Sequence, residues 1–135
     1  VLGSRGLGDV YKRQWLRFAH DHGLDFAQLR WCSKEVLSVD SDADIVFLDK
    51  GGNTYNFKNK DYTLSTPGGG AVVAFGMNLL GVELTLIGNC SVFKDKTMTA
   101  IRIYTNDGYY DFDIKEKNAK KLIKTYSLFE KALKK

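Results

Sequence analysis

Residues 101–114, IRIYTNDGYYDFDI, decide the fold of this chain. Apolar and polar side chains alternate on both sides of an Asp-Gly pair, a dipeptide that is typical of tight β-hairpin turns. A two-residue turn at Asp107-Gly108 pairs Ile103 with Phe112 on one face and Arg102 with Asp113 on the other. The same register adds the pairs Ile101/Ile114 and Tyr104/Asp111. The pattern therefore predicts an antiparallel hairpin with one buried face and one solvent face.

The residues after this hairpin predict an amphipathic helix with Asn118 as its N-cap. Apolar side chains recur there at i, i+3, i+4 and i+7 spacing, which places them on one stripe. The stripe consists of Ala119, Leu122, Ile123, Tyr126, Phe129 (or Glu130 by strict spacing) and Leu133. We expect this stripe to pack on the sheet while the intervening lysines face water.

Further strands are predicted on the N-terminal side of the hairpin. Residues 83–93 and 97–105 alternate and are joined by a Lys-Asp-Lys turn, and shorter strands are expected at 35–39 and 61–66. Residues 45–48 and 53–57 form a second hairpin, in which a Gly51-Gly52 turn sets Leu48 opposite Tyr55 and Val46 opposite Phe57. The chain as a whole predicts an α+β fold, with antiparallel strands and a C-terminal helix that packs on the sheet; the resemblance described below implies that this sheet is strongly bent or closed into a barrel.

Residues 71–88 form a long apolar stretch that raises the question of a membrane span. A spanning helix needs ~20 mostly apolar residues. This stretch contains Asn78, Glu83 and several small residues, and it ends in a β-type alternation. We favour two buried strands bent at the glycines, with a membrane-associated segment as the alternative.

The N-terminal third divides into two segments. Residues 4–14 reverse-translate in one open frame into a sequence that resembles a sequencing-library adaptor, so we expect residues 1–14 to be extraneous and disordered and the natural sequence to begin near Trp15. Residues 15–33 show mixed helical spacing, with Asp25 as a candidate N-cap, and are expected to be a helical remnant with one short helix. Residues 34–135 then form a single domain.

The hairpin at 101–114, followed by Asn118 and the helix through Leu133, resembles the end of bacterial pleckstrin-homology-like domains. In that family a strongly bent antiparallel barrel is plugged at one end by a C-terminal amphipathic helix. The resemblance implies such a barrel for residues 34–135 and a binding or assembly module, often at membranes, with no catalytic residues to carry over. The glycine-rich centre and the N-terminal helical segment depart from the family pattern.

Charge is unevenly distributed along the chain. The net charge of +4 falls to +2 when the adaptor residues Arg5, Lys12, Arg13 and Asp9 are set aside. Residues 115–135 hold eight lysines against two glutamates, whereas residues 15–114 are net acidic. A basic helix of this kind is typical of a solvated face that complements the helix dipole, and also of attraction to an anionic surface.

We expect a protein or an anionic lipid as the partner, and no nucleic acid. The candidate ligand-binding residues are four lysines in predicted turns: Lys58, Lys60, Lys94 and Lys96. Ordinary solvated turns are the competing interpretation of these lysines. Cys32 and Cys90 lie far apart in the sequence, which fits a reducing compartment or one optional disulfide, and we favour a cytoplasmic or membrane-associated location.

The remaining motifs predict no catalytic, metal or cofactor chemistry. Asp40-Ser-Asp42-Ala-Asp44 opens like a calcium loop, but Ile45 and Gly51 stand where that pattern requires glycine and a bidentate glutamate. His20 and His22 are two residues apart and would not share a helix face. We therefore expect a non-enzymatic binding or assembly module, with a structural component of a larger assembly, such as a phage or envelope protein, as the alternative.

Overall fold

The computed structural model describes residues 2–4, 15–33, 36–65, 72–74 and 77–134. Its elements in chain order are β1 (Leu2–Ser4), β2 (Trp15–Asp21), β3 (Leu24–Ser33), β4 (Ser38–Val39), β5 (Asp44–Asp49), β6 (Thr54–Asn59), β7 (Thr63–Leu64), β8 (Val72–Ala74), β9 (Met77–Ile87), the 3-10 helix η1 (Cys90–Lys94), β10 (Met98–Thr105), β11 (Gly108–Asp113) and α1 (Glu116–Leu133). The fold is α+β, as the sequence predicts, and its one described α-helix is C-terminal.

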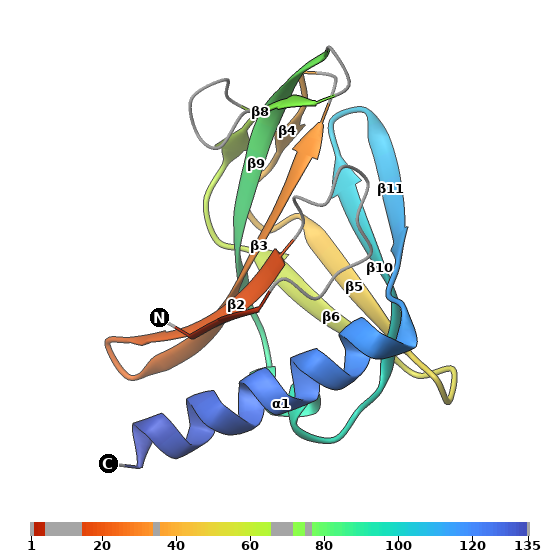
Figure 1. The fold of residues 1–135 in the computed structure, drawn as a ribbon. Helices are drawn as coiled ribbons and strands as arrows, with labels where there is room; N and C mark the ends of the chain where they lie inside the picture. The colour runs from red at the N-terminus through yellow and green to blue at the C-terminus, as the bar shows by residue number, and fades with distance from the viewer. Residues whose placement is uncertain (1, 5–14, 34–35, 66–71, 75–76, 135) are drawn as a thin grey trace.

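The strands form one large antiparallel sheet in the order β1-β2-β3-β9-β6-β5-β10-β11, with β8 paired to β9 beside this path. β4 and β7 form a separate two-stranded sheet. The large sheet is strongly bent (Figure 1), and the bend lies where β9 meets β6 through only two residue pairs, Lys58/Ile87 and Asn59/Leu86. No pairing among the described strands joins β1 to β11, so the sheet is open rather than closed into a barrel.

Residues 15–33 form a β-hairpin, so the expected helical remnant is wrong. His22 and Gly23 both take positive φ angles, 51° and 77°, which is the geometry of a two-residue turn whose twist matches its strands. Alternate side chains then point into the core: Leu16 and Phe18 from β2, and Ala27, Leu29 and Trp31 from β3. Strand formation overrides the helical spacing because β3 also pairs with β9 along its other edge.

The adaptor-like segment is ordered in part. Leu2–Ser4 pairs with residues 16–18 of β2, so the expected disorder does not hold for these three residues. Main-chain hydrogen bonding depends little on side-chain identity, which lets these three residues extend the sheet at its edge. Residues 1 and 5–14, which carry the rest of the predicted adaptor, lie outside the described residues.

The hairpin of β5 and β6 is present, but its predicted register is wrong by one residue. Phe57 lies opposite Ile45 instead of Val46, and Tyr55 lies opposite Phe47 instead of Leu48. A shift of one residue exchanges the two faces of a strand. Ile45, Phe47 and Phe57 are therefore buried, whereas Val46 and Leu48 lie on the outer face.

The loop between these strands explains the difference, because it has three residues rather than two. The backbone N–H of Asp49 donates to the carbonyl of Asn53, which places the pair one step further along the loop. Gly52 takes a φ of 89° directly after the turn. A type I turn followed by one residue in the left-handed region, often glycine, is the usual three-residue hairpin loop.

The hairpin of β10 and β11 is also present, with a register that differs from the predicted one by two residues. Arg102 lies opposite Asp111 instead of Asp113, and Ile103 lies opposite Tyr110 instead of Phe112. Asn106 and Asp107 form the turn, and Gly108 follows it with a φ of 89°. A shift of two residues leaves each side chain on its expected face. The predicted separation of buried isoleucines from exposed charges is therefore confirmed.

Two predicted boundaries in the centre of the chain change. β9 ends at Ile87 rather than at Phe93, and the chain then turns at Gly88 into η1. A Cβ atom at Gly88 would lie 2.5 Å from the Phe57 ring, so the backbone approaches that ring too closely for any larger residue. The short strands predicted at 35–39 and 61–66 are reduced to β4 and β7.

α1 begins at Glu116, with Lys115 as the N-cap, so the prediction of Asn118 as N-cap is wrong. The chain enters the helix at once because the N–H of Ile114 still bonds to the carbonyl of Thr99 at the end of β11. The predicted stripe is confirmed for the buried residues Ala119, Leu122, Tyr126 and Phe129, whereas Leu133 is exposed. α1 lies across one end of the bent sheet (Figure 1).

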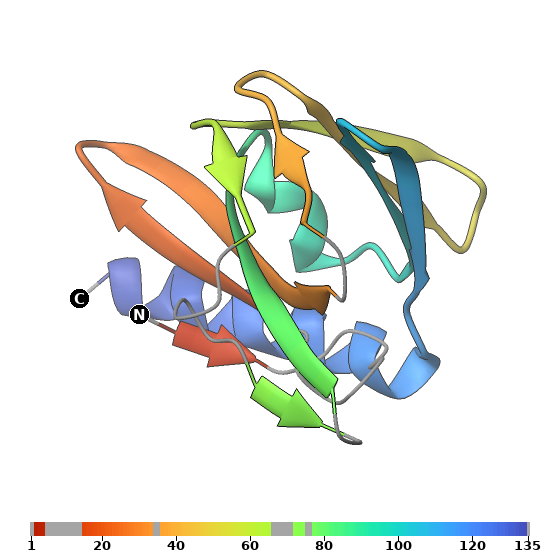
Figure 2. The ribbon, with the colours of Figure 1, turned by 90° about the horizontal axis from the view of Figure 1, so that it is seen from above.

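An aromatic cluster fills the space between the sheet and α1. Its centre is Phe93 of η1, whose ring centroid lies 5.1 Å from that of Phe18, 5.0 Å from that of Phe47 and 5.7 Å from that of Phe57. Tyr126 and Phe129 of α1 join the cluster through Phe18, at 5.1 Å and 5.9 Å. Figure 2 shows η1 within the curve of the sheet, which is how a short helix reaches the centre of the core.

Candidate binding surfaces

The solvent side of α1 is the most basic surface among the described residues. Helical residues advance by ~100° each, which places six exposed side chains opposite the buried stripe: Lys117, Lys120, Lys121, Lys124, Leu128 and Lys131. We call these six residues the lysine face. Leu128 lies among the lysines with 52% of its surface exposed. A cationic face with an exposed leucine suits contact with an anionic, partly apolar surface.

The acidic residues of α1 do little to reduce the charge of the lysine face. Glu130 lies 3.7 Å from Nζ of Lys94, a lysine outside the face. Glu116 lies 3.7 Å from Nζ of Lys120, an exposed i,i+4 pair that contributes little stability. Among the described residues, no ion pair joins the other four lysines of the face to an acidic side chain, so their positive charge is directed toward solvent.

The outer face of β6, β5, β10 and β11 is the second candidate surface. The observed registers align its side chains in three rows across the four strands. The first row contains the pairs Lys58/Asp44 and Tyr104/Tyr109. The second row is Asn56, Val46, Arg102 and Asp111. The third row is Thr54, Leu48, Ala100 and Asp113. We call this surface the outer sheet face. The predicted register of β5 and β6 does not show this surface, because it places Val46 and Leu48 on the same face as Phe57, which the structure buries.

A hollow of about 300 Å³ opens on the outer sheet face. Its apolar lining is Val46, Leu48 and Ala100, and its charged lining is Arg102, Asp111 and Asp113. The short side chain of Ala100 leaves the space between Leu48 and the carboxylate of Asp113. The hollow therefore combines an apolar floor with the two carboxylates of Asp111 and Asp113 on its β11 side.

Arg102 and Asp111 form the best-defined ion pair of this surface. Nε and Nη2 of Arg102 donate to the two carboxylate oxygens of Asp111 at 2.8 Å and 2.9 Å. This bidentate contact lowers the pKa of Asp111 below its ordinary value and raises that of Arg102. The guanidinium also lies 4.0 Å from the ring centroid of Tyr109, which adds a cation–π contact.

Asp113 differs from its neighbour, because no hydrogen bond or ion pair joins it to another residue in the described ranges. It is exposed at the end of β11. A carboxylate without a partner, beside an apolar hollow, is suited to receive a cation whose stem is aliphatic. Lysine and arginine side chains have that chemistry.

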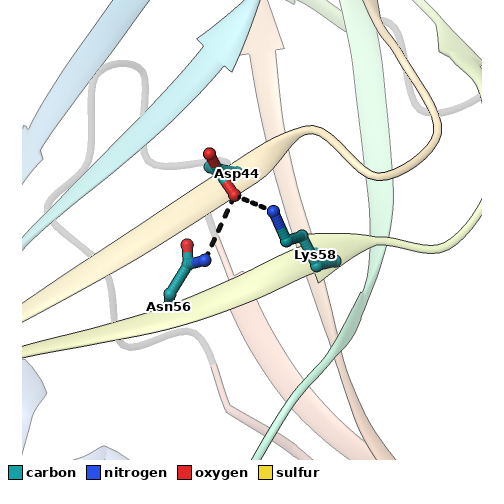
Figure 3. Close-up of polar contacts among 3 residues, drawn as sticks. All are labelled: Asp44, Asn56 and Lys58. Atoms are coloured by element: carbon teal, nitrogen blue, oxygen red, sulfur yellow. Dashed lines mark hydrogen bonds and ion pairs between the residues drawn. The ribbon is translucent and has the colours of Figure 1, made fainter.

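Asp44, the last aspartate of the calcium-loop-like segment at residues 40–44, is engaged within the sheet. Oδ1 of Asp44 accepts hydrogen bonds from Nδ2 of Asn56, at 3.1 Å, and from Nζ of Lys58 (Figure 3). The hydrogen bond from Lys58 is the largest cause of the lowered pKa of Asp44. The carboxylate is therefore engaged across β5 and β6. No group of three or more His, Cys, Asp or Glu residues in the described ranges is placed to hold a metal ion.

The structure separates the four lysines predicted as ligand contacts. Lys58 and Lys60 lie where β6 meets β9, since Lys58 is opposite Ile87 and the N–H of Lys60 bonds to Thr85. Lys94 ends η1 and Lys96 lies in the connection from η1 to β10, which meets the β5–β6 loop where the N–H of Lys50 bonds to the carbonyl of Thr97. These two places are at opposite ends of β6. The four lysines therefore do not converge on one site, although each is exposed.

The two histidines and the described cysteine are placed as follows. Nδ1 of His20 lies 2.6 Å from Oδ1 of Asp25, its cross-strand partner in the β2–β3 hairpin. His22 is in the turn of that hairpin. Cys90 is a free, buried thiol, and burial raises its pKa to about 12. A thiol with that pKa stays protonated at neutral pH and is a poor nucleophile.

No helix in the part of the chain that the structure describes is long and apolar enough to cross a bilayer. Comparison of the chain with protein-family models, with curated proteins and with solved structures found no match. A functional proposal therefore rests on the lysine face and the outer sheet face.

Proposed function

We propose that this chain is a non-enzymatic binding module that associates with an anionic membrane surface through the lysine face of α1. The observation that carries the proposal is the grouping of five lysines around the exposed Leu128 on the helix side opposite the core. Each lysine near an anionic bilayer contributes about 1 kcal/mol of attraction. Leu128 adds apolar contact at the level of the headgroups.

The packing of α1 supports this proposal. Ala119, Leu122, Tyr126 and Phe129 hold the helix in the core, so the lysines are presented by a fixed surface rather than by a free tail. A fixed surface loses less conformational entropy on binding than a flexible segment does. The proposal also agrees with the resemblance to bacterial pleckstrin-homology-like domains, whose members often act at membranes.

Vesicle flotation tests this function. We expect the protein to float with phosphatidylserine-containing vesicles and not with pure phosphatidylcholine vesicles, and to be released by added salt, because screening weakens exposed charge interactions. The triple variant Lys117→Glu/Lys121→Glu/Lys124→Glu should lose flotation. Leu128→Ala should weaken it while leaving its salt dependence unchanged.

A second triple variant, Lys50→Glu/Lys60→Glu/Lys96→Glu, provides the matched control. It makes the same change of charge at exposed lysines away from α1, and we expect it to float like the parent chain. Loss of flotation in this variant but not in the α1 variant would show that the loop lysines, and not the lysine face, form the membrane-binding surface. Absence of flotation combined with stable oligomers in light scattering would favour the alternative, a structural component of an assembly.

A further inference from the structure

The open edge of β11 presents both its backbone and its acidic side chains. β11 is the last strand in the sheet order, and no described strand pairs with its second edge. Antiparallel strands direct the N–H and C=O groups of successive residues to alternate sides. The N–H of Ile114 bonds to the carbonyl of Thr99, so the even-numbered backbone groups of β11 face β10. The backbone groups of Tyr109, Asp111 and Asp113 therefore point to the open edge.

The same three residues carry their side chains on the outer sheet face. All three are exposed, and Asp111 and Asp113 line the hollow. A strand added to this edge would place every second side chain on the outer sheet face, directly beside these residues. The residues that could form its main-chain hydrogen bonds are thus the residues that its side chains would meet.

The charges at this edge select among the strands that could occupy it. The segment from Asp107 to Asp113 contains three aspartates and no lysine or arginine. Antiparallel pairing with a second copy of β11 would set aspartates opposite aspartates, and like charges directly opposite each other are destabilising. An added strand with basic side chains at alternate positions would instead meet Asp113, which has no partner in the described ranges.

We propose that the edge of β11 at Tyr109, Asp111 and Asp113 binds an extended peptide that carries lysine or arginine at alternate positions. The peptide adds as a strand to the sheet. The basic side chain opposite Asp113 pairs its cation with the Asp113 carboxylate, at the β11 side of the hollow. This site lies on different elements from the lysine face and binds a ligand of opposite charge.

Fluorescence anisotropy with labelled peptides tests the proposal on the full chain. The alternating peptide Val-Lys-Val-Lys-Val-Lys-Val should bind. The peptide Val-Val-Lys-Lys-Lys-Val-Val has the same composition without alternation, and Val-Glu-Val-Glu-Val-Glu-Val reverses the charge; both should bind at least about tenfold more weakly, which corresponds to ~1.4 kcal/mol. The alternating peptide with a methyl group on the backbone nitrogen of each lysine should fail to bind, because it lacks the N–H donors for strand pairing.

Variants of the chain complete the test. Asp113→Lys should weaken binding of the alternating peptide about tenfold, whereas Asp61→Lys, the same charge change at another exposed aspartate, should not. Tyr109→Pro removes an N–H that faces the open edge, where proline is tolerated, and should also weaken binding. Equal binding of the alternating peptide and of Val-Val-Lys-Lys-Lys-Val-Val would overturn the proposal. Unchanged binding by both edge variants in folded protein would also overturn it. Edge-to-edge dimers of the unliganded chain would assign the edge to a second copy.

Discussion

Asp49 shows how one side chain sets the path of a loop. Its carboxylate accepts hydrogen bonds from the N–H of Asn53 at 2.9 Å and from the hydroxyl of Tyr55 at 2.6 Å. Sequence reasoning identified the glycine turn beside it, but not this contact. The carboxylate holds Asn53 opposite Asp49 and so lengthens the loop to three residues. An error of one residue in the register of β5 and β6 follows from that omission.

The contact between Asp49 and Tyr55 predicts a pH dependence of stability. The Tyr55 hydroxyl is the largest cause that holds the pKa of Asp49 below its ordinary value, and the carboxylate raises the pKa of Tyr55 to about 12. A carboxyl whose folded pKa is lowered contributes stability that is present above its unfolded pKa of about 4 and is lost as the pH falls through the folded pKa. A tyrosine whose folded pKa is raised contributes stability that is present below pH ~10 and is lost as the pH rises toward 12.

Tyr55→Phe should therefore lower the urea midpoint at neutral pH and reduce the loss of stability on acidification below pH ~4. Urea denaturation followed by circular dichroism over this pH range measures both effects. Tyr62→Phe, at a tyrosine with 61% of its surface exposed, is the control and should match the parent chain. An acid profile of Tyr55→Phe identical to that of the parent would contradict the assignment.

At the scale of elements, the hairpins were predictable to different degrees. The β10–β11 hairpin and the buried stripe of α1 follow from alternation and helical spacing, which are strong signals over 101–133. The β2–β3 hairpin was missed although His22-Gly23 and the alternation of Ala27, Leu29 and Trp31 were visible, because short apolar runs fit both periods. The outer sheet face was missed because a single-residue error in register places its β5 residues Val46 and Leu48 on the opposite face.

The turn between β9 and η1 gives a prediction at this scale. Gly88→Ala would place a methyl group 2.5 Å from Cδ2 of Phe57 in the core, and we expect a loss of about 1–3 kcal/mol in the free energy of unfolding. Gly51→Ala is the matched control, because its nearest neighbours lie at 3.4 Å, and it should change stability by less than about 0.5 kcal/mol. Chemical denaturation of both variants checks this, and similar losses in the two would remove the steric explanation.

At the scale of the whole molecule, the core depends on contacts between distant segments. Sequence patterns predicted the buried isoleucines of the β10–β11 hairpin and the buried stripe of α1, but not that η1 carries the central residue of the core, since Phe93 was placed at the end of a strand. The position of Phe93 follows from the bend of the sheet and from the place where α1 packs against it. Neither is encoded in a local pattern.

Phe93→Ala should destabilise the chain by about 3–5 kcal/mol, because the side chain is fully buried and contacts rings from β2, β5 and β6. Thermal unfolding should remain a single transition at a lower temperature, since the same ring supports both halves of the sheet. Val36→Ala, with 71% of its surface exposed, is the control. Loss of the signal from α1 alone, with the sheet retained, would show that the halves fold independently.

The packing of Phe18 against residues much later in the sequence has a consequence for protein synthesis. Its ring stays without its principal partners until Phe93, Tyr126 and Phe129 have left the ribosome, and these residues come from the last third of the sequence. The nascent β2–β3 hairpin therefore emerges with an apolar face that η1 and α1 cover later. A chain that lacks α1 is therefore expected to expose this apolar face and to aggregate.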